Sequence, residues 1–234
     1  MKVTYYGHSA FQIEIEAEGA GPKTLLFDPF LTGNKHAEEA GISPDGLTPD
    51  VVLLTHAHGD HWGDTPAILK RTGALLVSQY EVVEYAKREH GHEKGHPMNT
   101  GGTWSFDWGR VTNTYARHSS SFPDGTYGGL SSGFLLEVEG KTVYNSGDTC
   151  AFAEMAWIGE DNEIDLAFLP IGDDFTMGIR EAVRCVEMLR PKLVVPVHYN
   201  TFPYVMADPE DFARRVADAG FEARVLGAGE TLEV

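Results

Sequence analysis

The sequence has few cysteines and no long apolar runs, and each shortage excludes a class of protein. Its 234 residues include only two cysteines, Cys150 and Cys185, which are far apart and lack a paired spacing. We therefore expect two buried free thiols in a reducing cytoplasm rather than a disulfide framework. No apolar run approaches the roughly 20 residues that cross a bilayer, and the N-terminus enters a predicted strand without a signal peptide, so no membrane association is expected.

Basic residues are also scarce. The chain has 18 Lys and Arg against 35 Asp and Glu, which gives a formal net charge of −17. Short basic pairs such as Lys70-Arg71 and Arg214-Arg215 stand at helical spacing and indicate solvated helix faces rather than a stripe for phosphate backbones. We therefore expect no nucleic-acid partner and favour a small neutral or weakly anionic substrate.

Apolar residues make up 42% of the chain, and no linker, low-complexity tract or short repeat divides it. A chain of this length and composition can bury a large core, so we expect residues 1–234 to form a single domain. The composition leaves the oligomeric state open, and a homo-oligomer is compatible with it.

Four candidate metal ligands are concentrated in the segment Thr55-His56-Ala57-His58-Gly59-Asp60-His61. The apolar run Asp50–Leu54 before it predicts a buried strand, and Thr65-Pro66 after it predicts the start of a helix. The ligands therefore lie on a strand-to-helix loop, which can turn imidazoles and carboxylates toward one point. Four donors are more than one open catalytic metal needs from a single loop, so the motif indicates two metals. The alternative is a polar loop with histidines placed by chance.

Three further candidates, His118, Asp148 and His198, stand singly at the ends of predicted strands. Each alone is more often a hydrogen-bonded structural group, but together with the loop motif they complete a two-metal set. A carboxylate can bridge two cations, whereas a single imidazole nitrogen cannot. The set therefore divides into His56, His58 and His118 for one ion and Asp60, His61 and His198 for the other, with Asp148 between them.

The T-H-x-H-x-D-H loop, followed in order by these three residues, resembles the metallo-β-lactamase superfamily, and the resemblance covers essentially all 234 residues. The segments Met1–Phe11, Leu26–Pro29, Leu169–Gly172 and Phe175–Gly178 are similar to compact metal-dependent hydrolases of unassigned substrate, relatives of the ascorbate-6-phosphate lactonase branch. The resemblance implies an α/β fold, a four-layer αβ/βα sandwich of two mixed β-sheets flanked by helices. It also implies metals at one edge of the sheets and a hydroxide bridging them as the nucleophile.

Departures from other branches narrow the expected activity. Asp148 stands where many β-lactamases of this fold have a cysteine, so antibiotic hydrolysis is not expected. Only 36 residues follow His198, too few for the helical substrate domain of glyoxalase II. No insertion resembles the RNA-grasping arm of the tRNA-processing members.

Three residues of the expected site, Asp60, Asp28 and His8, have expected roles beyond the assignment of metal ligands. Asp60 is expected to ligate its metal and orient the hydroxide proton. Asp28 matches a family position that braces the metal loop by bonding the far nitrogen of a ligating imidazole, and an Asp-Pro turn is compatible with this. His8 is a candidate to bind substrate or to donate a proton to the leaving group, or else is hydrogen-bonded in a strand turn.

The loop around Asp173, Phe175 and Met177 is expected to shape a substrate pocket. Asn200 and Thr201 are candidates to contact substrate or to form a turn. A second group, His90, His92 and His96, is interpreted as part of a solvated loop rather than a metal site. A serine-hydrolase role for Ser119–Ser121 is rejected, because no nucleophile-elbow glycine pattern surrounds these serines.

Local patterns also predict the elements. Ser78-x-x-Glu81 is a capping box before a helix that Gly91 ends, an apolar stripe from Ile179 to Leu189 predicts another helix, and Asp208-Pro209 opens the last. The predicted strands are Lys2–Tyr6, Phe11–Glu16, Thr24–Phe27, Val51–Leu54, Ala74–Val77, Arg110–Tyr115, Ser132–Val138, Thr142–Asn145, Leu166–Leu169, Leu193–Val197, Ala223–Leu226 and Glu230–Val234.

Together these observations predict a dinuclear metal-dependent hydrolase acting on a small-molecule lactone or ester. The alternatives are a metal-dependent phosphodiesterase acting on a small phosphoester, and a metal-binding sensor or interaction protein with little catalysis. The expected cofactors are two divalent ions, with zinc first and manganese, iron, nickel and cobalt sharing the same ligands.

Overall fold

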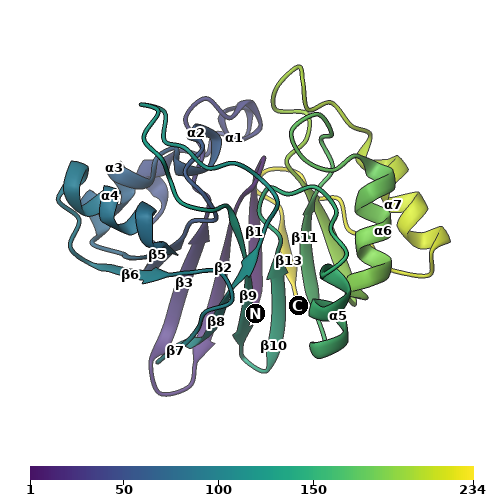
Figure 1. Cartoon of the computed structure of the whole chain (residues 1–234), viewed down its shortest axis with the longest axis horizontal. Coiled ribbons are helices and arrows are strands. Elements are labelled where there is room, and N and C mark those ends of the chain that lie inside the picture. The colour runs from purple at the N-terminus through teal and green to yellow at the C-terminus, as the bar shows by residue number, and fades with distance from the viewer.

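Two mixed β-sheets lie face to face with helices on their outer sides, which confirms the predicted α/β sandwich (Figure 1). The computed structural model describes residues 1–234. Helices α1 to α4 lie beside the first sheet, and α5, α6 and α7 cover the second. None of the helices is long and apolar enough to cross a membrane.

The first sheet has the strand order β13-β1-β2-β3-β4-β5-β6. Its amino-terminal strands pair antiparallel, whereas β3 to β6 run parallel. The strands are β1 (Lys2–Gly7), β2 (Ala10–Ala17), β3 (Gly21–Phe27), β4 (Val51–Leu53), β5 (Leu75–Gln79), β6 (Gly95–Met98) and β13 (Thr231–Glu233).

The second sheet has the order β12-β11-β10-β9-β8-β7, and β10, β11 and β12 run parallel. Its strands are β7 (Thr103–Phe106), β8 (Gly109–Tyr115), β9 (Ser132–Val138), β10 (Lys141–Asn145), β11 (Leu166–Pro170) and β12 (Leu193–Val197). The helices are α1 (Lys35–Glu39), α2 (Gly59–Trp62), α3 (Thr65–Thr72), α4 (Tyr80–His90), α5 (Met155–Asp161), α6 (Ile179–Leu189) and α7 (Pro209–Asp218), with a 3₁₀ turn at Pro44–Gly46.

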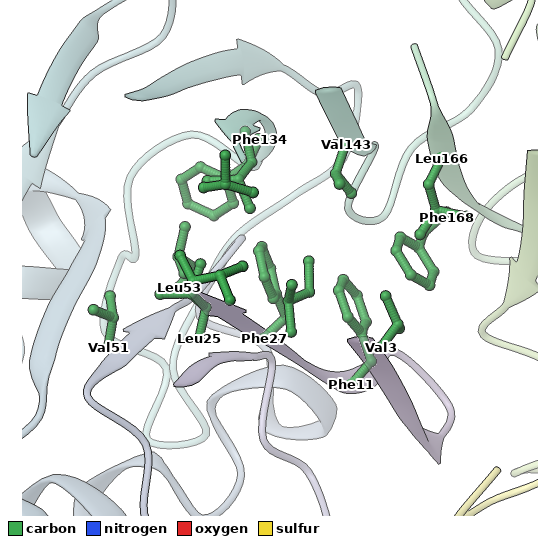
Figure 2. Packing of buried hydrophobic residues seen from close by; sticks show 14 of the residues in the cluster. Val3, Phe11, Leu25, Phe27, Val51, Leu53, Phe134, Val143, Leu166 and Phe168 are labelled. Carbon is green, nitrogen blue, oxygen red and sulfur yellow. The ribbon is translucent and has the colours of Figure 1, made fainter. Parts of the chain in front are cut away.

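The largest buried cluster, of 23 residues, fills the space between the sheets (Figure 2). Side chains of a strand alternate between its two faces, so Leu25 and Phe27 enter this cluster while Leu26 joins the helices outside. Phe11 joins the sheets, because its ring stacks on Phe27 of the first sheet at 4.5 Å and on Phe168 of the second at 3.9 Å. This packing fixes the two sheets against each other and so positions the strand ends that carry the site.

Several local predictions are wrong. Ala223–Leu226 forms no strand and contributes only an isolated bridge between Ala223 and Val194. The strands β6 and β7 were not predicted, and His96 lies in β6 rather than in a loop. The capping box is absent, because Ser78 belongs to β5 and its hydroxyl donates to the carbonyl oxygen of Leu54. Cys150 is exposed, whereas Cys185 is buried as expected.

Other helix boundaries agree with the sequence. Gly91 follows α4 in the left-handed conformation, with φ of 66°, where a glycine adds no steric cost. Asp208 caps α7, and its side chain accepts a hydrogen bond from the backbone N–H of Glu210. Pro209 then occupies the first helical turn, as the sequence predicted.

Candidate metal centre

The predicted ligands come together at one edge of the two sheets, just beyond the carboxyl ends of several strands. The metal loop follows β4, Asp148 follows β10 and His198 follows β12. Their donor atoms form three overlapping groups in which all atoms lie within 4.8 Å of one another. The groups are His56, His58 and His118; His56, His61 and Asp148; and His8, Asp60, His61 and His198.

The first group contains three imidazole nitrogens facing one point. Nδ1 of His58 lies 3.0 Å from Nε2 of His56 and 3.2 Å from Nε2 of His118. Nitrogens that each lie 2.0–2.1 Å from one tetrahedral zinc would stand about 3.3 Å apart. The spacing of these atoms therefore fits a single ion held by all three rings.

Asp148 connects this group to the group that contains Asp60, His61 and His198. Its Oδ2 atom lies 3.6 Å from Nε2 of His118 and 3.9 Å from Nε2 of His56. The same oxygen lies 3.2 Å from Nε2 of His61 and 3.0 Å from Nε2 of His198. One carboxylate oxygen thus reaches imidazoles of both groups, which is the arrangement expected of a bridging ligand.

The chemistry of the donors fits divalent cations. Asp148 is buried, and neither its Oδ1 atom nor Nε2 of His61 has a hydrogen-bond partner. A buried carboxylate is costly unless positive charge compensates it. Burial opposes protonation of His198, but the charge of Asp148 and its hydrogen bond raise the pKa of His198 to about 9. The site therefore stabilises positive charge where a metal would lie.

Asp28 and Thr55 fix the orientation of two of these imidazoles. Asp28 accepts hydrogen bonds from the backbone N–H and the hydroxyl of Thr55, each at 2.8 Å. Its Oδ2 atom also lies 3.0 Å from Nδ1 of His61, so this nitrogen is the protonated one and Nε2 is free to bind a metal. This is the position predicted for Asp28.

Thr55 fixes the orientation of His56, which belongs to the group with His58 and His118. Its hydroxyl has one proton, which it donates to Asp28, so Nδ1 of His56 must be the donor of the 3.1 Å contact with Oγ1 of Thr55. Nε2 of His56 is then unprotonated and faces the other donors. Ser119 lies 3.3 Å from Nε2 of His58, which leaves Nδ1 of that ring for the metal. Thr55 and Ser119 were not predicted in these roles, although Thr55 opens the motif.

His8 lies behind Asp60 rather than in the open part of the site. It is 0% exposed, and its Nε2 atom lies 3.1 Å from Oδ2 of Asp60. Its Nδ1 atom lies 2.9 Å from Oγ1 of Thr201. Burial and the neighbouring His198 lower the pKa of His8 to about 4, so it is neutral at pH 7. A ring placed in this way contacts Asp60 and offers no exposed surface to a substrate.

Asp60 is the more accessible carboxylate of the centre, since its side chain is 26% exposed. Burial opposes its ionisation, but hydrogen bonds from His198 and His8 hold the pKa of Asp60 well below its usual range. The structure therefore places an ionised, partly exposed carboxylate beside His61 and His198.

The backbone is strained around the centre. His8, Asp28, His198 and Asn200 all have positive φ, between 40° and 56°. Such conformations cost a non-glycine residue of order 1 kcal/mol or more, and they concentrate at functional sites. The sharp turns let the chain leave β1, β3 and β12 and direct these side chains toward one another.

The residues predicted to shape a substrate pocket differ in their exposure. Phe175 is exposed on the loop after β11, and Asp173 is exposed beside it. Met177 instead packs against Cys185 in the cluster beneath α6 and is 1% exposed, so it offers no surface to a substrate. Asn200 accepts a hydrogen bond from the backbone N–H of Ala207, which supports its alternative role in forming the loop.

The second histidine group does not assemble into a metal site. Nε2 of His92 contacts the carbonyl oxygen of Lys94 at 3.0 Å. The ring of His90 packs 5.6 Å from Trp62, and that of His96 packs 5.0 Å from Trp104. These three rings therefore have separate structural partners.

Comparison with known proteins finds relatives that match the chain over most of its length. Residues 23–199 match a family model described as the beta-lactamase superfamily domain. A protein of Salinibacter ruber named UPF0173 metal-dependent hydrolase is 49% identical over 231 residues, which cover 99% of each chain. The UPF0173 metal-dependent hydrolase YtkL of Bacillus subtilis is 46% identical over 242 aligned positions and is covered in full.

A solved structure shares both fold and sequence with the chain. Igni18, described as a novel metallo hydrolase from the archaeon Ignicoccus hospitalis, is 38% identical with a TM-score of 0.85. The match covers 100% of this chain and 98% of that one. The metal centre thus lies in a fold that this hydrolase shares over its whole length.

Proposed function

The chain belongs to the beta-lactamase superfamily and is a metal-dependent hydrolase, and from this premise we propose that it is a two-metal enzyme that cleaves a small-molecule lactone or ester. The observation that carries the proposal is the position of Asp148. Its Oδ2 atom lies between 3.0 and 3.9 Å from imidazole nitrogens of both donor groups. A single carboxylate in this position can be shared by two ions.

In this proposal the residues divide between two ions in the way expected from the sequence. His56, His58 and His118 would hold one ion, and Asp60, His61 and His198 the other, with Asp148 common to both. Imidazole and carboxylate donors suit zinc first and also manganese, iron, nickel or cobalt. When bound, such ions would lower the pKa of a water toward about 7, which would supply a hydroxide nucleophile, and they would polarise the oxygen of the bond to be cleaved.

The protein's own groups then orient the reaction. Oδ2 of Asp60 is held by His8 and lies 3.5 Å from Nε2 of His198, which leaves Oδ1 to accept a hydrogen bond that orients the attacking water. Thr201 fixes the far nitrogen of His8, so Asp60 is supported by a chain of two side chains. Asp28 and Thr55 hold His61 and His56 in the tautomers that leave their Nε2 atoms unprotonated.

An acyl substrate is favoured over a phosphoester by the charge around the site. The segments 118–131, 171–178 and 198–208, which begin at or lie beside candidate donors, contain no Lys or Arg, and the whole chain carries a net charge of −17. A phosphodiester would meet positive charge only at the metals, whereas a neutral carbonyl needs no further counter-charge.

The test combines metal content with turnover. The zinc- and manganese-loaded proteins are assayed on lactones, thioesters and phosphodiesters beside the Asp148→Ala variant, and bound metal is measured for each. We expect two ions per chain and hydrolysis of lactones or esters that the variant loses. Turnover of phosphodiesters alone would replace the acyl assignment. Two bound ions without turnover of any class would support the metal-binding alternative.

A further inference from the structure

Two loops extend the fold at the edge that carries the metal centre. Residues 171–178 follow β11, and residues 199–208 follow β12 directly after His198 (Figure 1). Because β11 and β12 are parallel neighbours, both loops leave the sheet at the same edge. Gly172 lies so close to the carbonyl oxygen of His198 that a side chain there would collide with it, and a Cβ would lie 2.8 Å from Cβ of Val205. The loops therefore contact each other immediately beside a metal donor.

These loops expose large apolar side chains. Phe175 is 56% exposed, Tyr204 is 71% exposed and Met206 is 60% exposed. The rings of Phe175 and Tyr204 are packed edge to face, with centroids 6.3 Å apart. Single exposed apolar residues are common, but a group of them beside a functional centre marks a binding surface. We call Phe175, Tyr204 and Met206 the apolar rim.

Phe202 connects the rim to the donors. It lies on the same loop as Tyr204, and its ring is 5.5 Å from that of His8, the partner of Asp60. On the other side of the metal loop, Tyr127 and Leu130 are also exposed. Their loop packs against the metal loop, because a Cβ at Gly59 would lie 3.6 Å from the ring of Pro123. Exposed apolar side chains therefore occur both on the loops that pack beside His198 and on the loop that packs against the metal loop.

Positive charge is missing from the same surface. The segments 118–131, 171–178 and 198–208 contain no Lys or Arg, and they contribute Asp124, Asp173, Asp174 and Asp208. The nearest basic residue along the chain, Arg117, pairs with Glu154 at 3.6 Å. An anionic group on the substrate would find no cationic side chain on these three segments and would be repelled by their acids.

We propose that the substrate is uncharged and carries an apolar group, aromatic or alkyl, next to the bond that is cleaved, and that this group packs on Phe175 and Tyr204. The assignment deepens the proposed function and rests on it. A small molecule fits this surface better than a second copy of the chain, because a protein seated on the rim would also cover the donors and close the site.

The experiment uses γ-lactones whose alkyl substituent grows from methyl to heptyl, together with the same lactones ending in a carboxylate. Each methylene that packs on the rim should raise kcat/KM by about fourfold until the surface is filled. Phe175→Ala and Tyr204→Ala should each raise KM for the long neutral lactones about tenfold and leave kcat within twofold. Trp157→Ala is the matched control, because Trp157 is 65% exposed but lies on α5, away from these loops.

Binding of the neutral fluorophore Nile red, measured without turnover, separates the two claims. Loss of probe binding in the Phe175 and Tyr204 variants, but not in Trp157→Ala, supports the rim as an apolar ligand site even if no lactone is hydrolysed. In that case only the proposed reaction fails. Faster turnover of the carboxylated lactones, or rim variants with unchanged KM and probe binding, would overturn the proposal. So would rim variants that change only the oligomeric state, since the rim would then be an interface between copies.

Discussion

The hydroxyl of Thr55 donates a hydrogen bond to the carboxylate of Asp28 at 2.8 Å. This hydrogen bond joins two residues that each contact the imidazole of a different proposed metal ion. Asp28 also holds Nδ1 of His61, and Thr55 also contacts Nδ1 of His56. The two buried residues thus set the tautomer of one imidazole for each proposed ion. The loop motif alone does not contain this arrangement, because Asp28 comes from the end of β3.

Removing the charge of Asp28 should weaken metal binding. Asn tolerates the positive φ of 40° at this position, so Asp28→Asn changes the hydrogen bonding with little backbone strain. The carboxylate accepts from the backbone N–H of Thr55 at Oδ1 and from the Thr55 hydroxyl and His61 at Oδ2. The amide has only one acceptor oxygen, so at least one of these three donors would face its NH₂ group instead. We expect zinc affinity to fall about 10- to 100-fold, measured by competition with a chromophoric chelator. Unchanged affinity at both ions would contradict the role given to Asp28.

Thr55 allows a matched pair of substitutions. Thr55→Val keeps the shape but leaves the buried Asp28 and His56 without the hydroxyl, so the free energy of unfolding should fall by about 1–3 kcal/mol. Thr55→Ser restores the hydroxyl and should recover most of the metal affinity that Val loses. Urea unfolding of the metal-free proteins separates stability from metal binding. Equal behaviour of the Val and Ser variants would show that the hydroxyl is unimportant.

His8 should act on the second ion through Asp60. In His8→Ala, Asp60 loses the partner at 3.1 Å that holds its Oδ2 atom, so the ion at Asp60, His61 and His198 should bind more weakly. We expect bound zinc to fall from two ions toward one per chain at limiting free metal, and Thr201→Val to show a smaller effect in the same direction. A variant that keeps both ions but loses kcat would instead favour direct proton donation by His8.

An ion-pair cluster outside the candidate metal centre should contribute to the free energy of unfolding and to its dependence on pH. Asp165 accepts from Lys192 at 2.8 Å and from the backbone N–H of Thr142 at 2.9 Å, and Lys141 lies nearby. Burial opposes ionisation, but these partners lower the pKa of Asp165 below its usual value. A lowered folded-state pKa stabilises the protein above the unfolded value of about 3.9 and loses that contribution as pH falls through the folded value.

Asp165→Asn should therefore lower the free energy of unfolding by about 1 kcal/mol at pH 7, since the lysines are partly exposed. The difference from the wild type should narrow as the pH falls below about 4. Chemical unfolding of both proteins at a series of pH values measures this difference in the free energy of unfolding. A difference that stays constant down to acid pH would mean that the charge of Asp165 is unimportant.

The candidate donors chosen from the sequence lie close together in the structure, because the segments that carry them follow strands whose ends meet at one edge of the sandwich. Prediction from the sequence failed where tertiary contacts override local patterns. Ser78 matches a capping box, but its hydroxyl bonds Leu54 on the neighbouring strand. β6 contains Gly95 and Pro97, and β7 is a short edge strand whose residues are mostly exposed, so neither has the alternation that reveals a strand.

His8 shows the same limit at the site. Its sequence context gives a histidine at the end of β1, but the contacts with Asp60 and Thr201 join residues 52 and 193 positions away. No local signal encodes such pairings. Met177 was misplaced for a related reason, because the chain after β11 turns it inward beneath α6 while Phe175 remains exposed.

The most direct test of the central claim is anomalous diffraction at the zinc edge from crystals of the zinc-loaded protein. The account predicts two peaks about 3.5–4 Å apart, one among His56, His58 and His118 and the other among Asp60, His61 and His198. Asp148 should lie between the peaks and contact both. A single peak at full zinc saturation, or a second peak that does not contact Asp148, would contradict the two-metal centre.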